Sequence, residues 1–173
     1  MKIKMPFVAF LLCLLFISGC ESKKEKEVVQ PVEQSKSNDM PSFVKESDIE
    51  KINWDRMVTK IGTNGPSDII GNKNKLGIIG PELPPKKVEK WLWHFWGVSS
   101  GKLTIVGYHK ETSTKHPVLI GSWSREGITG GKINGADASM PSNVSLPESG
   151  KWALLVYVDE RLFDTLVIDV KEN

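Results

Sequence analysis

The fold class is decided by the C-terminal stretch Trp152-Ala-Leu-Leu-Val-Tyr-Val158, Asp159-Glu-Arg161, Leu162-Phe-Asp-Thr-Leu-Val-Ile-Asp-Val170. Two runs rich in aliphatic, β-branched and aromatic residues are separated by three charged residues, the length of a short hairpin loop. Apolar residues recur at every second position, so each run places a row of apolar side chains on one face. The stretch therefore predicts two antiparallel strands that share a core. The two rows are Trp152, Leu154, Val156 and Val158, and Leu162, Leu166, Ile168 and Val170.

Further strand signals precede this hairpin, and no stretch has the pattern of a long helix. Several short strands at short intervals predict an all-β domain, an antiparallel immunoglobulin-like β-sandwich, with a small barrel as the second choice. We expect this domain to cover residues 53–173, which is enough chain for a single hydrophobic core. The strands are predicted over residues 91–96, 103–109 and 118–123, with shorter ones over 68–71 and 75–80.

The amino terminus has a different character. A basic segment, residues 1–5, precedes about twelve apolar residues that end at Ile17, and Ser18-Gly19-Cys20 follows. These are the parts of a secretory signal peptide over residues 1–19, and the apolar run falls short of the ~20 residues that span a bilayer. Ile17-Ser-Gly-Cys20 resembles the bacterial lipobox, which implies cleavage before Cys20 and a lipid on its sulfur. We therefore expect the mature chain to be anchored in the cell membrane, on its extracytoplasmic face.

Residues 20–52 separate the anchor from the predicted domain. This stretch is charged, contains Ser, Gln and Pro, and has no aromatic residue before Phe43. Such a composition buries too little apolar surface to offset the entropy of ordering, so it predicts a flexible tether. Within the tether, Ser47 to Glu50 match a capping box, which predicts a short helix.

Charge and cysteine content exclude several classes of function. The formal charge of +2 falls to zero when Lys2 and Lys4 leave with the signal peptide. A neutral chain without basic clusters is not expected to bind nucleic acid. Because Cys13 is also removed and Cys20 carries lipid, the domain has no cysteine for a disulfide, a thiol nucleophile or a zinc–thiolate site. We expect no metal and no cofactor.

Several sequence blocks carry a resemblance to a known family. They include Trp93-His-Phe-Trp-Gly97, Gly135-Ala-Asp-Ala138 and Leu146-Pro-Glu-Ser-Gly-Lys-Trp152. With these blocks the chain, from about Ile61 to its end, is similar to uncharacterised lipoproteins of spore-forming Gram-positive bacteria. The resemblance implies a membrane location and an immunoglobulin-like domain, and it implies no activity.

The run Trp91-Leu-Trp-His-Phe-Trp96 is the most unusual stretch of the chain. Alternation places its odd-numbered residues on one face, which we expect in the core, and Leu92, His94 and Trp96 on the other. The favoured interpretation is that both faces are covered. The functional alternative makes His94 and Trp96 part of a platform on which a glycan or an aromatic ligand stacks.

Other candidate sites are weaker. The glycine-rich stretch 127–137 matches neither a phosphate-binding nor a calcium loop, and we expect a loop in which Asp137 is a candidate binding residue. The three histidines, His94, His109 and His116, lack the spacing of metal ligands. The mature chain has no nucleophile elbow, zinc-protease helix or Ser-x-x-Lys motif, so we do not expect an enzyme.

The sequence thus predicts a non-enzymatic module that binds an extracytoplasmic protein or a wall component. Two alternatives stay open, a receptor for a wall glycan or small ligand, and a hydrolase with dispersed catalytic residues. Exposure of the aromatic run separates them: buried rings favour a protein partner, and an exposed row of rings favours a sugar. A cleft in which His meets Asp or Glu would favour the enzyme.

Overall fold

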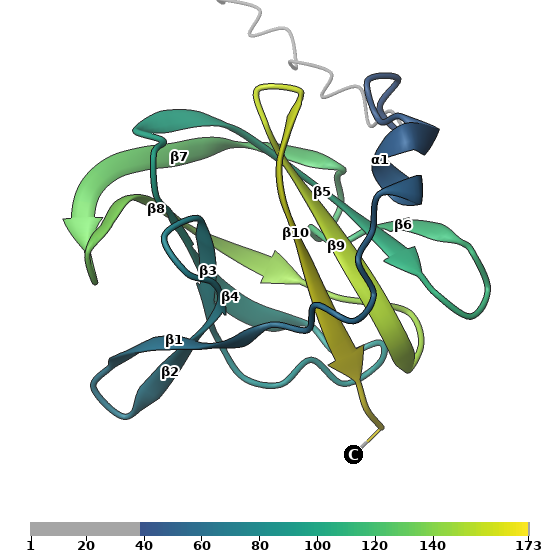
Figure 1. The fold of residues 1–173 in the computed structure, drawn as a ribbon, viewed down its shortest axis with the longest axis horizontal. Coiled ribbons are helices and arrows are strands. Elements are labelled where there is room, and N and C mark those ends of the chain that lie inside the picture. The colour runs from purple at the N-terminus through teal and green to yellow at the C-terminus, as the bar shows by residue number, and fades with distance from the viewer. Residues whose placement is uncertain (1–38, 173) are drawn as a thin grey trace, which may run out of the picture. The chain divides into compact units, whose positions relative to one another are not determined.

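The computed structural model describes residues 39–172, and the predicted signal peptide, Cys20 and residues 20–38 of the tether lie outside this range. The described residues form one short helix and ten strands (Figure 1). These elements are α1 Glu46–Glu50, β1 Thr59–Asn64, β2 Ser67–Asn72, β3 Leu76–Ile79, β4 Glu89–Phe95, β5 Ser100–His109, β6 Lys115–Pro117, β7 Ser124–Ile133, β8 Ala136–Val144, β9 Gly150–Val158 and β10 Arg161–Val170.

The strands follow one continuous hydrogen-bonded path, in the order β1-β2-β3-β4-β8-β7-β5-β9-β10, and β6 pairs with β5 beside this path. Every pairing between named strands is antiparallel. The prediction of an antiparallel all-β sandwich is therefore confirmed. What the sequence did not provide is the order in which the strands pair.

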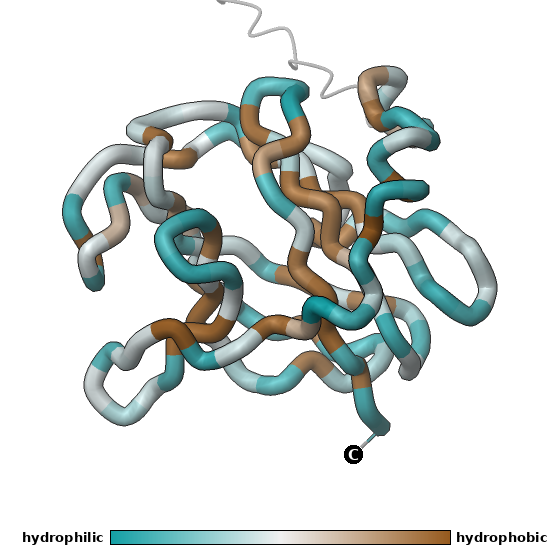
Figure 2. The backbone as a smooth tube through the Cα atoms, viewed as in Figure 1, coloured by the Kyte–Doolittle hydropathy of each residue, from teal (hydrophilic) through white to brown (hydrophobic). Residues whose placement is uncertain are grey.

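The sheet curls so that its two parts face each other across the main core. Trp93 and Phe95 of β4 enter this core from one side, and Trp152 and Leu154 of β9 enter it from the other. All four side chains are fully buried. Hydrophobic segments follow the strands in the middle of the domain, and hydrophilic segments gather in the hairpin turns (Figure 2). Burial of apolar surface between the two parts is the main term that stabilises the fold.

The β9–β10 hairpin forms where it was predicted, but its turn is one residue shorter and its second strand contains a bulge. Its turn has two residues, Asp159 and Glu160, which both adopt positive φ, a geometry that suits the twist of a hairpin. A register shift between Leu162 and Asp164 changes the alternation at the start of β10. As a result Leu162 is 37% exposed and Phe163 packs against the core in its place.

The strand predicted over 118–123 is wrong. The strand in this region is β6, which ends at Pro117, and Leu119 makes an isolated bridge with Val144. The chain then turns at Gly121, whose φ is +77°. Because L-residues rarely adopt that conformation, glycine at this position ends the run of extended backbone.

The loop predicted over 127–137 is also wrong, because most of it belongs to the hairpin of β7 and β8. The turn of this hairpin is Asn134-Gly135, with φ values of 54° and 79°. Asn-Gly is the preferred pair for a two-residue turn with positive φ at both positions. The glycines before it accompany a register shift between Gly130 and Ile133. These glycines therefore allow a bulge within a strand instead of forming a loop.

Packed structure begins before the predicted domain boundary at residue 53. Phe43 packs edge to face on Tyr157, and Val44 is buried in a second hydrophobic cluster on the outer face of β5, β9 and β10. The predicted short helix is α1, although Ser47 lies inside it and Lys45, at its N-cap, makes no side-chain capping bond. The part of the predicted tether from residue 39 to 52 is therefore packed against the sheet, since its few apolar residues match an apolar outer face.

Two polar contacts fix this N-terminal segment. The Tyr157 hydroxyl donates to Asp48 Oδ2 at 3.1 Å, and Lys115 forms an ion pair with Glu46. Burial raises the pKa of the Tyr157 phenol above its ordinary value, and the hydrogen bond and charge of Asp48 act in the same direction. The phenol therefore stays protonated and able to donate to the carboxylate.

Candidate binding site

The two ends of the curled sheet meet along a line that we call the seam, with β10 on one side and the segment from Met57 to β3 on the other. Near the start of β10, Asn72 Nδ2 donates to Asp164 Oδ2 and to the main-chain oxygen of Thr165. Further along, the Val58 N–H donates to the Val167 oxygen at 3.0 Å. Beyond Val167 no strand among the described residues continues this pairing.

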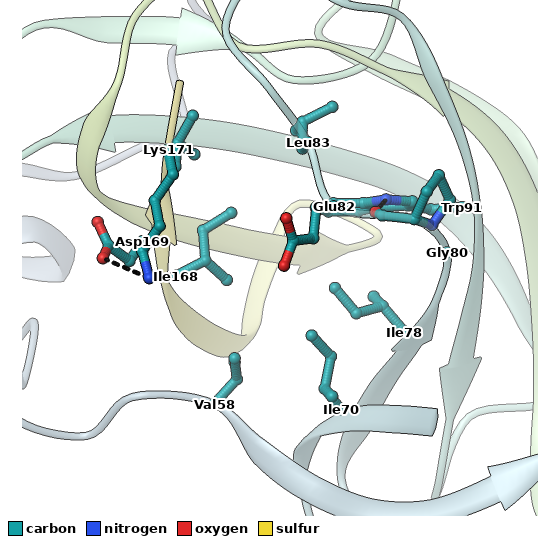
Figure 3. Close-up of a pocket in the computed structure, with 12 residues that line it drawn as sticks. Val58, Ile70, Ile78, Gly80, Glu82, Leu83, Trp91, Ile168, Asp169 and Lys171 are labelled. Atoms are coloured by element: carbon teal, nitrogen blue, oxygen red, sulfur yellow. Dashed lines mark hydrogen bonds and ion pairs between the residues drawn. The ribbon is translucent and has the colours of Figure 1, made fainter. Parts of the chain in front are cut away.

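A cavity of about 240 Å³ lies where the seam is open. Its walls come from both parts of the sheet and from residues 80–83, which follow β3. Figure 3 shows these side chains around the opening. The apolar side chains of the wall are Val58, Ile70, Ile78, Pro81, Leu83, Trp91, Ile168 and Val170.

The wall formed by Trp91 depends on a close approach to Gly80. A Cβ atom at Gly80 would lie 2.0 Å from Cδ1 of the indole, a distance at which one of the two must move. The indole Nε1 donates to the Pro81 oxygen at 3.0 Å. Glycine at position 80 therefore lets the ring lie flat against the backbone, and the hydrogen bond fixes its orientation.

Charged residues occur only at the rim of the cavity. Lys171 Nζ lies 3.9 Å from Asp169 Oδ2, so this pair largely compensates itself. The Glu82 carboxylate extends over the cavity (Figure 3), and among the described residues it has no hydrogen-bond or ion-pair partner. The rim thus carries one uncompensated negative charge above an apolar wall.

The lining residues include no Ser, Thr, Cys or His side chain. The cavity can therefore exclude water from an apolar group, and Glu82 can attract a cation beside it. The ionisable groups of this wall are Glu82, Asp169 and Lys171.

The aromatic run contributes to the cavity through Trp91 alone. Trp91, Trp93 and Phe95 are buried, as expected for the core face of this run. Trp93 Nε1 also donates to Ser142 Oγ of β8 at 2.8 Å. This bond satisfies a polar atom that would otherwise be costly to bury.

The opposite face of the run is not an open row of rings. His94 is fully buried, with Nδ1 3.2 Å from the Leu92 oxygen and Nε2 2.9 Å from Asn134 Nδ2. Trp96 is half-buried and stacks on the imidazole at a centroid distance of 6.3 Å. Burial lowers the pKa of His94, and its contact with the Leu92 oxygen acts in the opposite direction. The neutral imidazole can donate one hydrogen bond and accept another, so His94 needs no ionic partner in this position.

Asp137 lies close to the same end of β4. Its Oδ2 accepts the Gly97 N–H at 2.7 Å and so ties the turn after β4 to the start of β8. The structure thus brings the three predicted site residues, His94, Trp96 and Asp137, into one region. In this region His94 contacts the Leu92 oxygen and Asn134, and Asp137 accepts the Gly97 N–H.

The other two histidines, His109 and His116, pack against Trp152 and not near His94. The ring of His109 lies 4.5 Å from that indole and the ring of His116 lies 5.6 Å from it. His109 Nε2 is 3.0 Å from Glu111 Oε2, and Nδ1 is 3.4 Å from Glu148 Oε1. These carboxylates sit two residues and 39 residues away in sequence, so spacing alone did not reveal the cluster.

Neither a metal cluster nor a membrane-spanning helix is found in residues 39–172. No three His, Cys, Asp or Glu side chains in this range are placed to hold a metal ion. No helix in the same range is both long and apolar enough to cross a bilayer.

Comparison with known proteins supports the fold. A sequence model of the family described as a domain of unknown function (DUF4871) matches residues 43–168. The chain is also similar to a crystal structure described as a "Putative Lipoprotein from Bacillus anthracis", with a TM-score of 0.62 and 24% identity. That similarity covers 77% of this chain and 97% of the other. No curated protein matches the sequence.

Proposed function

The chain belongs to the family of the domain of unknown function DUF4871, and from this premise we propose that it is a non-enzymatic binding module on the extracytoplasmic face of the cell membrane. It is held there by lipid on Cys20. It takes an apolar group of an extracytoplasmic protein into the cavity at the seam. The observation that carries this proposal is the apolar cavity with its single uncompensated carboxylate, Glu82.

The size of the cavity favours a side chain over a larger molecule. Pockets for small-molecule ligands measure about 300–1,000 Å³, and this cavity, at about 240 Å³, falls below that range. One buried aliphatic side chain contributes about 1.5–3 kcal/mol. Such binding is weak on its own, and a membrane anchor raises the local concentration at which the module meets its partner.

The proposed location rests on two further observations. The Ile17-Ser-Gly-Cys20 sequence supports lipid attachment, and the structural neighbour from Bacillus anthracis is described as a "Putative Lipoprotein". The burial of the aromatic run supports a protein partner over a glycan, because a sugar platform needs rings that are open to solvent.

Photo-crosslinking in native cells tests the proposed site. The lipoprotein is expressed with p-benzoylphenylalanine in place of Glu82, at the rim, or in place of Glu126, an exposed residue of β7 that does not line the cavity. We expect a reproducible protein adduct from position 82 and none from position 126. Both substituted proteins are first checked for the same melting temperature.

Three outcomes would overturn the proposal. Equal adducts from both positions would show that the cavity is not the contact. Adducts with wall fragments alone would favour the glycan receptor. Turnover of a peptidoglycan or peptide substrate by the full-length protein would favour the hydrolase.

A further inference from the structure

Within residues 39–172, no segment pairs with the edge of β10 that lies beside the cavity. The Val58 N–H donates to the Val167 oxygen, so the main-chain groups of Val167 point away from β9 and towards the seam. In an antiparallel ladder the residues that point outward alternate. The N–H and C=O groups of Asp169 therefore point to the same free edge, where the segment after Val58 has left to pair with β2.

The free edge and the cavity are parts of one surface. Ile168 and Val170 direct their side chains into the main core and line the cavity, while Asp169 between them offers its main-chain groups outward. A strand added to this edge would place the side chain opposite Ile168 on the same face as Ile168. That side chain would enter the cavity and contact Ile70, Ile78 and Trp91.

We propose that the free edge of β10 and the adjoining cavity form a β-augmentation site for an extended peptide that carries a large aliphatic side chain next to a lysine or arginine. The inference rests on the proposed function, because it names the partner of the same cavity. In this mode main-chain hydrogen bonds give affinity and a side-chain pocket gives specificity.

The basic residue follows from the charge of the rim. Glu82 extends over the cavity without a partner among the described residues (Figure 3), whereas Asp169 is already paired with Lys171. An aliphatic residue that enters the cavity brings its neighbours in the peptide within reach of Glu82. A cationic neighbour would compensate this carboxylate, and an anionic one would be repelled.

The test uses the full-length, detergent-solubilised lipoprotein and a defined probe, the peptide acetyl-Ser-Thr-Lys-Leu-Lys-Thr-Ser-amide. Binding is followed by NMR as changes in the amide signals of Asp169 and Lys171 and as slower exchange of those amides. We expect replacement of the probe's leucine by alanine to weaken binding at least about tenfold, because most of the buried apolar surface is lost. Replacement of both lysines by glutamate should abolish it.

Two changes test the edge itself. In an antiparallel added strand, the lysine before the leucine lies opposite Asp169, and its N–H faces β10. N-methylation of the peptide at this lysine removes that main-chain donor, and we expect it to weaken binding about tenfold. In the protein, Asp169→Pro removes the outward N–H and leaves the β9–β10 ladder intact, since proline is tolerated where the N–H faces away from the neighbouring strand.

The charge of the rim is tested separately. Glu82→Gln should weaken peptide binding about threefold, as expected for an exposed ion pair, and Glu126→Gln should not change it.

The outcomes separate this inference from the proposed function. If position 82 gives a specific protein adduct but N-methylation leaves peptide binding unchanged, the edge is not used and the inference is overturned while the proposed function stands. If position 82 gives no specific adduct and the peptide does not bind, the proposed function and the inference are both overturned. Sedimentation that shows dimers lost in Asp169→Pro would make a second copy the occupant and would also overturn the inference.

Discussion

Asn72 and Asp164 are 92 residues apart in sequence, and their side chains meet at 2.9 Å across the seam. Asn72 is 6% exposed and lies at the end of β2, whereas Asp164 lies near the start of β10. The same amide nitrogen also donates to the Thr165 oxygen at 3.0 Å. The contact therefore joins the two ends of the curled sheet near the start of β10, and the seam opens into the cavity further along, beyond Val167.

Removal of this contact should destabilise the whole domain. Asn72→Ala leaves two acceptors without their donor in a largely buried place, so we expect the free energy of unfolding to fall by about 1–3 kcal/mol. Urea unfolding followed by tryptophan fluorescence measures the loss. Asn64→Ala, an exposed position at the end of β1, is the matched control and should stay within about 0.5 kcal/mol of the parent. Equal losses in both variants would contradict the proposed role of Asn72 at the seam.

Trp152 is the main aromatic side chain that β9 contributes to the core. It is fully buried, and its Nε1 donates to the main-chain oxygen of Glu148 at 3.1 Å. We expect Trp152→Ala to cost about 3–5 kcal/mol, as large aromatic truncations in cores do. Trp152→Phe should cost less and keep the protein folded if the alanine variant does not fold. Trp54→Ala, at a half-buried position, serves as the comparison, and a cost there as large as at position 152 would argue against core packing as the cause.

The contact between Gly80 and Trp91 predicts how the cavity can be changed without altering its charges. In Gly80→Ala the new methyl group would lie 2.0 Å from the indole, so we expect Trp91 to move and the domain to lose about 1–3 kcal/mol of stability. NMR signals of the Trp91 indole N–H and of Ile168 should shift. Gly62→Ala is the control, because a Cβ there makes only an ordinary contact of 3.5 Å with Ile69. Unchanged indole signals in Gly80→Ala would show that the backbone moves instead of the ring.

His94 predicts a pH dependence of stability. Burial lowers the pKa of its imidazole in the folded state, while in the unfolded chain that pKa is about 6.5. The unfolded state therefore binds the proton first as the pH falls, and the free energy of unfolding decreases below about pH 6.5. Above that pH both states carry a neutral imidazole and the effect is absent.

The variant His94→Gln isolates this contribution. His109 and His116 are present in both proteins, so the difference between parent and variant reports on His94. We expect the parent to lose more stability than the variant between about pH 8 and about pH 5. Urea unfolding at a series of pH values provides the measurement, and a difference that stays constant with pH would contradict the prediction.

Lipid attachment can be tested at the two cysteines of the chain. Two or more acyl chains anchor a protein stably, whereas a single chain is marginal. In a Gram-positive host grown with an alkyne fatty acid, we expect the parent and Cys13→Ala to carry label on the mature protein and Cys20→Ala to carry none. Mass spectrometry of the amino terminus should show a modified Cys20. A free Cys20, or label in all three proteins, would exclude the proposed anchor.

The local patterns of the sequence were enough to predict the fold class and the burial of particular residues. Alternation in the run Trp91 to Phe95 placed Trp91, Trp93 and Phe95 in the core, because side chains in a strand point to opposite faces by local geometry alone. The same rule identified β9 and β10. The rule was wrong at Leu162, because a bulge between Leu162 and Asp164 changes which face of the sheet the side chains occupy. A bulge of this kind has no distinctive residue composition. The Asn134-Gly135 pair is a local signal for the turn between β7 and β8, but the glycine-rich stretch around it was interpreted as a loop, so this hairpin was missed.

The candidate site, by contrast, was decided by the tertiary structure. Glu82, Trp91 and Ile168 belong to segments that are separate in the chain and carry no common motif, and they meet because the sheet curls until β10 faces β2 and β3. The sequence determined which residues form strands, because that depends on neighbours one or two positions away. Which strand edges meet, and where the seam stays open, depends on pairing between residues as far apart as Asn72 and Asp164, because such contacts form only once the strands between them have packed.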